Sequence, residues 1–337
     1  MPGESTKSWR QGLADVLEIG QHNSIEIWFH QVLENAMSNN PEHKNEYGFK
    51  TVELPDYVAG DREPDHDQHI SEITEIVKET STMTYDEFLD NCKKLKANGI
   101  ASVAIGTKYL WTAAGWFDYI NLRTNGLDYH IDLMLGKTKY TDEGVVNTFK
   151  NWARAIDAGC FMDDHQNYRW QEGQAPLING EAASYLIGNF IVPNLPEETQ
   201  NQLDFYQFPP IDPNLELGED APTEIIFMPA NAQNVENGKK FMAFYAQPEN
   251  LTAMNNVLGQ LSPHSGSAAP SDRFQKAGAE MLSKSKTAQF FDRDTTPEMA
   301  KAAMQLMVDF MLDPCLLYTS DAADEGLGVD LGGRRII

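Results

Sequence analysis

The chain has 337 residues and carries 50 acidic against 26 basic residues, a formal net charge of −24 at pH 7. This length is enough for about two domains. So negative a balance argues against nucleic acids and anionic membrane surfaces as partners, and it favours a neutral ligand. The apolar runs are far shorter than the roughly 20 residues that a membrane-spanning helix requires.

The first 81 residues contain few sequence motifs that indicate a structure or a function. Met1 to Gln11 contains neither the apolar stretch of a secretion signal nor a lipobox cysteine, so we find no secretion signal in this chain. His66 and His69 lie among acids at a spacing that could hold zinc weakly on a helix, but no third soft ligand is patterned nearby. We therefore expect a solvated acidic surface there and no metal site.

The most informative region begins at Thr84. Thr84 and Glu87 match a capping box, and Gly99 supplies the position after the helix end. The apolar run 100–105 (IASVAI) then predicts a short buried strand. Aromatic side chains at the C-terminal end of a strand in an α/β protein suit a flat, hydroxyl-rich ligand such as a sugar. Five such side chains follow this strand: Tyr109, Trp111, Trp116, Phe117 and Tyr119.

Further helices and short apolar strands alternate along the chain. The start Thr296-Pro297-Glu298 is strong, because Pro fits the first turn and Glu complements the helix dipole. The alternation indicates α/β layering. We expect helices over 113–124, from 141–142 to 159, and over 176–180, 237–246 and 296–312, with strands over 183–187 and 225–228.

Two cysteines, Cys92 and Cys160, remain once the C-terminal tail is set aside. Neither belongs to a CxxC or Cys/His pattern, so the spacing supports neither a metal site nor a redox site. We expect two buried free thiols. A disulfide between them is the alternative that the sequence leaves open.

An ordered series of segments resembles the family-1 extracellular solute-binding proteins, the carbohydrate receptors of bacterial ABC importers. The resemblance covers roughly residues 82–314, and it depends on the order of its motifs. The motifs are the Thr84–Phe161 region, LINGEAASYLIGNF (177–190), DFYQFPPIDP (204–213), APTEIIFMPANAQNVENGKKFMAFYAQP (221–248) and QFFDRDTTPEMAKAAMQLMVDFMLDP (289–314).

The resemblance implies an α/β, two-lobe fold of the type II periplasmic-binding-protein kind, in which the lobes exchange segments. By this resemblance, residues 82–225 form the C-terminal lobe, 226–286 return to the N-terminal lobe, and 287–314 cross back. Residues 1–81 match poorly, so we expect an incomplete N-terminal lobe. Within this segment, the poor match of residues 22–81 is explained equally well by native divergence, a chimera or a frameshift.

The tail, residues 315–337, looks like the translation of a sequencing adapter. CLLYTSDAADE resembles its transposase end, and VDLGGRRII resembles its flow-cell end. We expect an artefactual, disordered segment that takes no part in the fold.

Sugar recognition combines aromatic faces with polar side chains for the hydroxyl groups. The resemblance places aromatics at Trp111 and Phe190, whereas Trp116 fits a ligand contact and core packing equally well. Asp292 and Arg293 could form bidentate hydrogen bonds with vicinal hydroxyls, or they could form an internal ion pair. Trp170 is a weaker candidate, and Trp152 fits the core better. The expected ligand-binding set is Trp111, Trp116, Asn189, Phe190, Thr223, Glu224, Asp292 and Arg293.

The resemblance implies a monomeric receptor outside the cytoplasm, periplasmic or lipid-anchored, that closes over a sugar or oligosaccharide and delivers it to a permease. The sequence contains no nucleophile elbow, Walker loop, HExxH or dinucleotide fingerprint, so we expect no catalytic residues and no cofactor. Two alternatives stay open. One is a glycosidase-like enzyme, which would need two suitably spaced carboxylates, and the other is a sugar-sensing receptor domain with the same fold.

Overall fold

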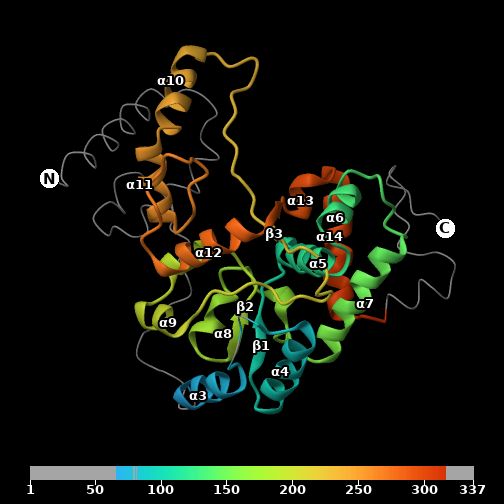
Figure 1. The fold of residues 1–337 in the computed structure, drawn as a ribbon. Coiled ribbons are helices and arrows are strands. Elements are labelled where there is room, and N and C mark those ends of the chain that lie inside the picture. The colour runs from blue at the N-terminus through green and yellow to red at the C-terminus, as the bar shows by residue number, and fades with distance from the viewer. Residues whose placement is uncertain (1–65, 79, 81, 316–337) are drawn as a thin grey trace. The chain divides into compact units, whose positions relative to one another are not determined.

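The computed structural model describes residues 66–78, 80 and 82–315, an α/β arrangement built mainly of helices (Figure 1). These residues form two compact units. The larger unit contains 66–188, 195–223 and 277–315, and the smaller contains Asn189–Asn194 and Glu224–Lys276. The expectations for residues 1–65 and for the tail beyond residue 315 lie outside the described residues.

The expected helices are all present, as α4, α5, α7, α8, α10 and α14, whereas α3, α6, α9, α11, α12 and α13 have no counterpart in the sequence prediction. In chain order the elements are α3 (His66–Ile76), α4 (Tyr85–Ala97), β1 (Ala101–Ala104), α5 (Trp111–Asn125), α6 (Leu127–Met134), α7 (Glu143–Asp157), η2 (His165–Asn167), α8 (Gln174–Ile178), β2 (Ala182–Tyr185), η3 (Asn189–Asn194), α9 (Glu197–Gln202), β3 (Gly218–Asp220), α10 (Val235–Tyr245), α11 (Pro248–Leu258), α12 (Arg273–Lys284), β4 (Lys286–Ala288), α13 (Phe291–Asp294) and α14 (Pro297–Leu312).

The larger unit contains two pairs of parallel strands. In one pair β1 lies beside β2, with Val103 opposite Ser184, and in the other β3 lies beside β4, with Asp220 opposite Ala288. Parallel neighbours need long crossover connections, and here helices supply them. The α/β layering expected from the sequence is therefore present in this unit.

The core of the larger unit is built around α5. Phe117 on α5 is fully buried and packs edge-on against Phe291, with ring centroids 5.7 Å apart. Phe149 on α7 packs against Phe310 on α14 at 4.9 Å. A core of this kind fixes where α5 begins, and the candidate site described below lies at that end.

Several helices begin or end at the capping residues that the sequence predicts. Thr84 and Glu87 form a reciprocal capping box at the start of α4, with the Thr84 backbone N–H donating to the Glu87 carboxylate at 2.8 Å. Gly99 follows α4 with φ of +76°, a conformation that favours glycine. The Thr296 hydroxyl accepts from the backbone N–H of Met299, which caps α14. These predictions are confirmed.

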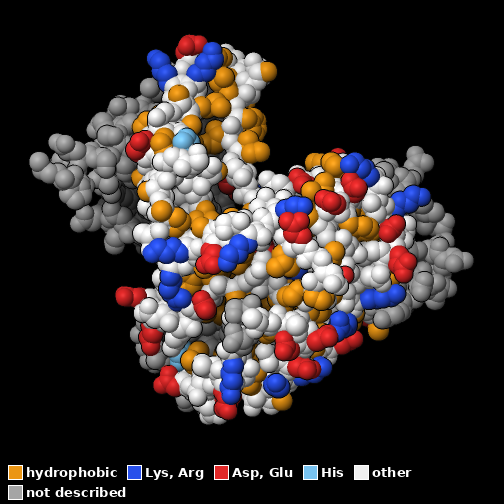
Figure 2. Space-filling view, in the orientation of Figure 1, with side chains coloured by type: hydrophobic (Ala, Val, Ile, Leu, Met, Phe, Trp, Pro, Cys, Tyr) orange, Lys and Arg blue, Asp and Glu red, His pale blue; other side chains and the backbone are white. Residues whose placement is uncertain are grey.

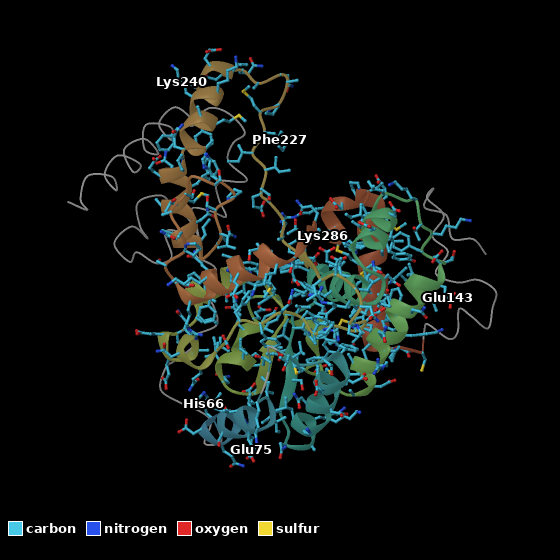
Figure 3. All side chains as sticks on the ribbon, in the orientation of Figure 1. His66, Glu75, Glu143, Phe227, Lys240 and Lys286 are labelled. Atoms are coloured by element: carbon cyan, nitrogen blue, oxygen red, sulfur yellow. A yellow bond between two sulfur atoms is a disulfide. The ribbon has the colours of Figure 1, made fainter. Side chains whose placement is uncertain are left out.

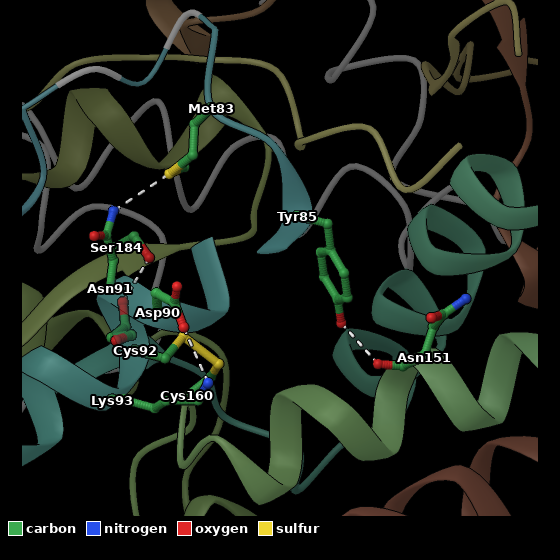
Figure 4. Close-up of a disulfide and its surroundings, with 10 residues drawn as sticks. Met83, Tyr85, Asp90, Asn91, Cys92, Lys93, Asn151, Cys160 and Ser184 are labelled. Carbon is green, nitrogen blue, oxygen red and sulfur yellow. Dashed lines mark hydrogen bonds and ion pairs between the residues drawn. A yellow bond between two sulfur atoms is a disulfide. The ribbon is translucent and has the colours of Figure 1, made fainter. Parts of the chain in front are cut away.

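The prediction of free thiols is wrong, because Cys92 and Cys160 form a disulfide, with Cα atoms 4.8 Å apart (Figure 4). Cys92 lies on α4, which packs against β1. The carbonyl of Cys160 accepts a hydrogen bond from Val103 of β1 at 2.8 Å, so both cysteines lie beside the same strand. Their spacing of 68 residues contains no signal of this meeting, which follows from the packing of α4 on β1 and from the pairing of the segment after α7 with Val103.

The prediction of a strand over 225–228 is also wrong. In the smaller unit this segment pairs with no strand among the described residues. Ile225 is 70% exposed and Phe227, labelled in Figure 3, is 77% exposed. An apolar run indicates a tendency to be buried, but a strand also needs a neighbour that completes its backbone hydrogen bonds.

Charged side chains of both signs are interspersed over the face shown in Figure 2, and hydrophobic side chains gather over α10 and the extended segment before it. His66 is buried at the start of α3, whereas Asp67 beside it is exposed, so the expected acidic surface is correct for Asp67 and wrong for His66. Among the described helices, none combines the length and the apolar character needed to cross a bilayer.

Candidate ligand-binding site

The connection from β1 to α5 is a tight turn over residues 105–110. Leu110, the residue before the helix, has φ of +67°, which is unusual for a residue with a side chain. Gly106 is required by a close approach, because a Cβ atom there would lie 2.2 Å from the carbonyl oxygen of Arg169. Backbone strain of this kind is often found at functional sites.

A second loop, residues 163–173, lies over this turn and is fastened to it by hydrogen bonds. The backbone N–H of Thr107 donates to the carbonyl of His165 at 2.9 Å, and that of Lys108 donates to Tyr168 at 3.0 Å. The Thr107 hydroxyl is 2.8 Å from Nδ1 of His165. Burial lowers the pKa of His165, which favours the neutral ring. The two loops therefore form one rigid unit at the start of α5.

The two loops bring together four side chains that we call the aromatic corner: Tyr109, Trp111, Arg169 and Trp170. The indole rings of Trp111 and Trp170 meet edge-on, with centroids 6.3 Å apart and an interplanar angle of 65°. The Arg169 guanidinium lies 5.7 Å from the centre of the Tyr109 ring, and Tyr109 is 53% exposed. Both tryptophans are half-buried, so ring surface remains available to a ligand.

Polar atoms without hydrogen-bond partners lie in the same loop. The side-chain atoms Oε1 of Gln166, Nε of Arg169 and Oε1 of Gln171 are buried and make no hydrogen bond. Burying an unsatisfied polar group costs about 1–3 kcal/mol. Three such atoms lie within six residues of the loop that also carries Trp170. Unused hydrogen-bonding capacity in a loop with a half-buried indole ring suits a ligand with both a flat apolar face and hydroxyl groups.

Of the expected site residues, Trp111 belongs to the aromatic corner and Trp116 does not. Trp116 is 1% exposed, and its ring packs edge-on against Phe161 at 4.7 Å and against Phe208 at 5.4 Å. Of the two roles that the sequence left open for Trp116, the geometry supports packing in the core. We therefore leave it out of the site.

Asp292 and Arg293 lie in the short helix α13. Burial raises the pKa of Asp292, and the neighbouring Arg293 opposes this shift. Arg293 is exposed, and its guanidinium lies 5.6 Å from the centre of the Phe290 ring. The predicted contact of these two side chains with ligand hydroxyls stays a prediction.

The other expected residues lie at sequence positions where the chain passes from one unit to the other. Thr223 ends a segment of the larger unit and Glu224 begins one of the smaller unit, and both are exposed. Asn189 and Phe190 begin η3 in the smaller unit, where both are half-buried. Their ligand roles also stay predictions, and within the larger unit the structure groups Trp111 with the rest of the aromatic corner.

Sequence reasoning missed Arg169, Gln166 and Gln171 and treated Trp170 as a weak candidate. One signal could have indicated them. The run Tyr168-Arg169-Trp170-Gln171 places two aromatic side chains, a cation and an amide in one loop, a composition common to carbohydrate sites. Their meeting with Trp111, about 60 residues earlier in the chain, could not be inferred from spacing.

A buried pair of carboxyl groups lies on α5 and β3. Burial raises the pKa of Asp118, although the Phe291 backbone N–H donates to its carboxylate at 2.9 Å. Burial and the charge of Asp118 raise the pKa of Asp220. The Asp220 carboxyl oxygens and Oδ1 of Asp118 are buried without hydrogen-bond partners. The whole Asp118 residue is closed off from solvent, so the pair does not offer a sugar the two accessible carboxylates of a glycosidase.

Comparisons with known proteins agree with this architecture. A sequence profile described as "Bacterial extracellular solute-binding protein" matches residues 51–252. An uncharacterized ABC transporter extracellular-binding protein of Pyrococcus horikoshii is 24% identical over 217 residues, which are 62% of this chain and 46% of that protein. The chain thus spans about half the length of this curated relative.

Comparisons with solved structures also identify solute-binding proteins. The bacterial solute receptor AcbH, described as having an exclusive preference for β-D-galactopyranose, is 28% identical with a TM-score of 0.64, over 75% of this chain and 67% of that one. A chitin oligosaccharide binding protein, 18% identical with a TM-score of 0.60 over 76% and 68% of the two chains, shares the fold. These likenesses confirm the predicted two-lobe, type II periplasmic-binding-protein fold.

Proposed function

Since the chain belongs to the bacterial extracellular solute-binding protein family, we propose that it is the substrate-binding component of a carbohydrate ABC importer. The observation that carries this proposal is the aromatic corner, where two half-buried indole rings meet at a loop that also contains polar atoms without hydrogen-bond partners. The likeness to AcbH supports a sugar as the ligand. No chemical step is needed, because a receptor only binds and releases its ligand.

In this proposal the apolar C–H face of a sugar ring stacks on Trp111 or Trp170. Each indole buries a large apolar area at little entropic cost, because its side chain is already fixed. The Tyr185 hydroxyl donates to the Trp170 carbonyl at 3.0 Å, which holds that residue in place before the ligand arrives. Ligand closure of two lobes would then produce the form that docks on the permease.

The protein acts outside the cytoplasm in this proposal, as a periplasmic or lipid-anchored receptor. The Cys92–Cys160 disulfide supports this location, because structural disulfides persist mainly in oxidising compartments. The acidic charge of the chain supports the absence of a nucleic-acid partner. We also propose that the receptor works as a monomer.

Calorimetric titration with D-galactose and a panel of other neutral sugars tests the proposal. We expect saturable binding, and Trp111→Ala and Trp170→Ala should each weaken it about tenfold or more, because each removes a stacking surface. Trp111→Phe keeps an aromatic face and should retain most of the affinity. The melting temperatures of the variants should stay close to that of the wild type.

The same samples separate a receptor from an enzyme. After incubation, NMR spectra of the bound sugar, and of a di- or oligosaccharide from the panel, should be unchanged. Hydrolysis of a glycosidic bond would favour the glycosidase alternative. The absence of binding to every sugar in the panel would refute the proposed function.

A further inference from the structure

The loop over the aromatic corner holds one cation, Arg169, in a defined position. Its backbone N–H donates to Oε2 of Glu172 at 2.7 Å, and its carbonyl oxygen sits against Gly106. Its guanidinium lies over the Tyr109 ring at 5.7 Å. Backbone and side chain are thus both placed before any ligand binds, so the group can donate to a ligand with little ordering cost.

The Arg169 side chain has hydrogen-bonding capacity that the protein does not use. The side chain is 38% exposed, its buried Nε makes no hydrogen bond, and Oε1 of Glu172 lies 3.9 Å from that Nε. That distance permits an ion pair but is too long for a hydrogen bond. On either side of Arg169, the buried amide oxygens of Gln166 and Gln171 also lack donors. One donor and two acceptors are therefore unsatisfied.

A sugar hydroxyl matches this set, because it both accepts and donates hydrogen bonds. A ligand carboxylate matches it poorly, because it can only accept, while two of the three free atoms are acceptors themselves. Glu172 adds a negative charge beside Arg169 and so balances the guanidinium. A second carboxylate brought to the same place would be repelled by Glu172.

We propose that Arg169 is the donor that binds ligand hydroxyls at the aromatic corner, and that Glu172 makes this site select neutral sugars over sugar acids. This proposal rests on the proposed function, since it concerns the same site. Beyond that function, the proposal names Arg169 and Glu172 as the residues that determine specificity, and neutral sugars as the class that they select. The amides of Gln166 and Gln171 complete the polar rim by accepting from the hydroxyls.

Titration of the full chain with D-galactose and with D-galacturonic acid near pH 7 tests the proposal. The two sugars differ at one carbon, which carries a hydroxyl in galactose and a carboxylate in the acid. Arg169→Gln should weaken galactose binding about tenfold or more, as expected for loss of a charged donor. Arg169→Lys keeps the charge but loses the planar donor geometry, and it should weaken binding nearly as much. Arg154→Gln is the matched control, because Arg154 pairs with Asp86 on the surface, and it should bind like the wild type.

Glu172→Gln tests the selectivity separately. The amide oxygen can still accept from the Arg169 backbone N–H, so the loop should keep its shape. The ratio of galacturonate affinity to galactose affinity should rise about fivefold, because one nearby negative charge is removed. Glu143→Gln removes an exposed acid on α7 (Figure 3) and should leave this ratio unchanged.

The possible outcomes distinguish the two proposals. If the wild type binds galactose, Trp111→Ala weakens binding and Arg169→Gln does not, the inference is wrong and the proposed function stands. If Arg169→Gln fails to fold, an unchanged affinity ratio for Glu172→Gln still overturns the selectivity. A wild type that prefers galacturonate contradicts the inference directly. A wild type that binds neither sugar and no other sugar of the panel overturns both proposals.

Discussion

Removal of the Cys92–Cys160 disulfide should destabilise the larger unit by about 4 kcal/mol. The bond links residues 68 apart in the sequence. A cross-link over that separation lowers the entropy of the unfolded chain by an amount worth about 4 kcal/mol at 25 °C in the chain-entropy treatment. Both cysteines are fully buried, so the bond should also resist reductant until the unit opens.

Urea unfolding of three samples measures this effect: oxidised wild type, reduced wild type and Cys92→Ala/Cys160→Ala. The emission of Trp116 and Trp152 reports on the larger unit, because both are buried in its core. With a slope of about 3 kcal/mol per molar urea, the midpoint should fall by about 1.3 M on reduction. Reductant should not shift the midpoint of the double alanine variant, which serves as the control.

Equal midpoints for oxidised and reduced wild type would refute this reasoning. A thiol titration gives an independent check. Among the described residues Cys315 is the free cysteine, so denaturation of the oxidised protein without reductant should expose one reactive thiol. Three reactive thiols would show that Cys92 and Cys160 are unpaired, as the sequence pattern suggested.

Two further outcomes follow from buried groups. Burial lowers the pKa of His130 to about 4. The unfolded chain therefore binds a proton between pH 6.5 and 4 that the folded chain does not, and folding stability should fall by up to about 3 kcal/mol as the pH drops through that window. His130→Gln should flatten this part of the stability curve in urea unfolding, and an unchanged curve would contradict the assignment. Gly106→Ala should lower both the melting temperature and galactose affinity, because its Cβ would lie 2.2 Å from the Arg169 carbonyl oxygen, whereas Gly115→Ala has open space around it and is the control.

The buried ion pair between Arg123 and Glu219 shows how the larger unit holds its second strand pair. Arg123 on α5 donates from Nε to the carbonyl of Phe208 at 3.0 Å, and it pairs with Glu219 on β3. The carboxylate of Glu219 also accepts from the Tyr119 hydroxyl at 3.1 Å and from the amide of Gln207 at 2.7 Å. A buried charge pair needs such additional hydrogen bonds to offset its desolvation. The sequence offers no signal of this network, because its members are up to 100 residues apart.

Local chemistry was sufficient to predict half of the described α-helices and several of their ends. The Thr84 capping box and the Thr296-Pro297-Glu298 start of α14 are interactions among residues three positions apart, so they can be read without knowing the fold. The position of Trp111 beyond a buried strand also predicted it as a ligand contact, a role that stays a prediction. The fold class was readable too, because alternating helices and apolar strands limit the possible layers.

Tertiary packing decided the rest. Trp111 and Trp116 are both tryptophans near the start of α5, yet Trp111 is half-buried in the aromatic corner and Trp116 is closed inside the core. The chain partners of Trp111, Cys92 and Arg123 are all about 60 to 100 residues distant. A sequence pattern reports the preferences of a residue and its near neighbours, whereas burial, disulfide pairing and site geometry depend on which distant surfaces meet when the helices pack.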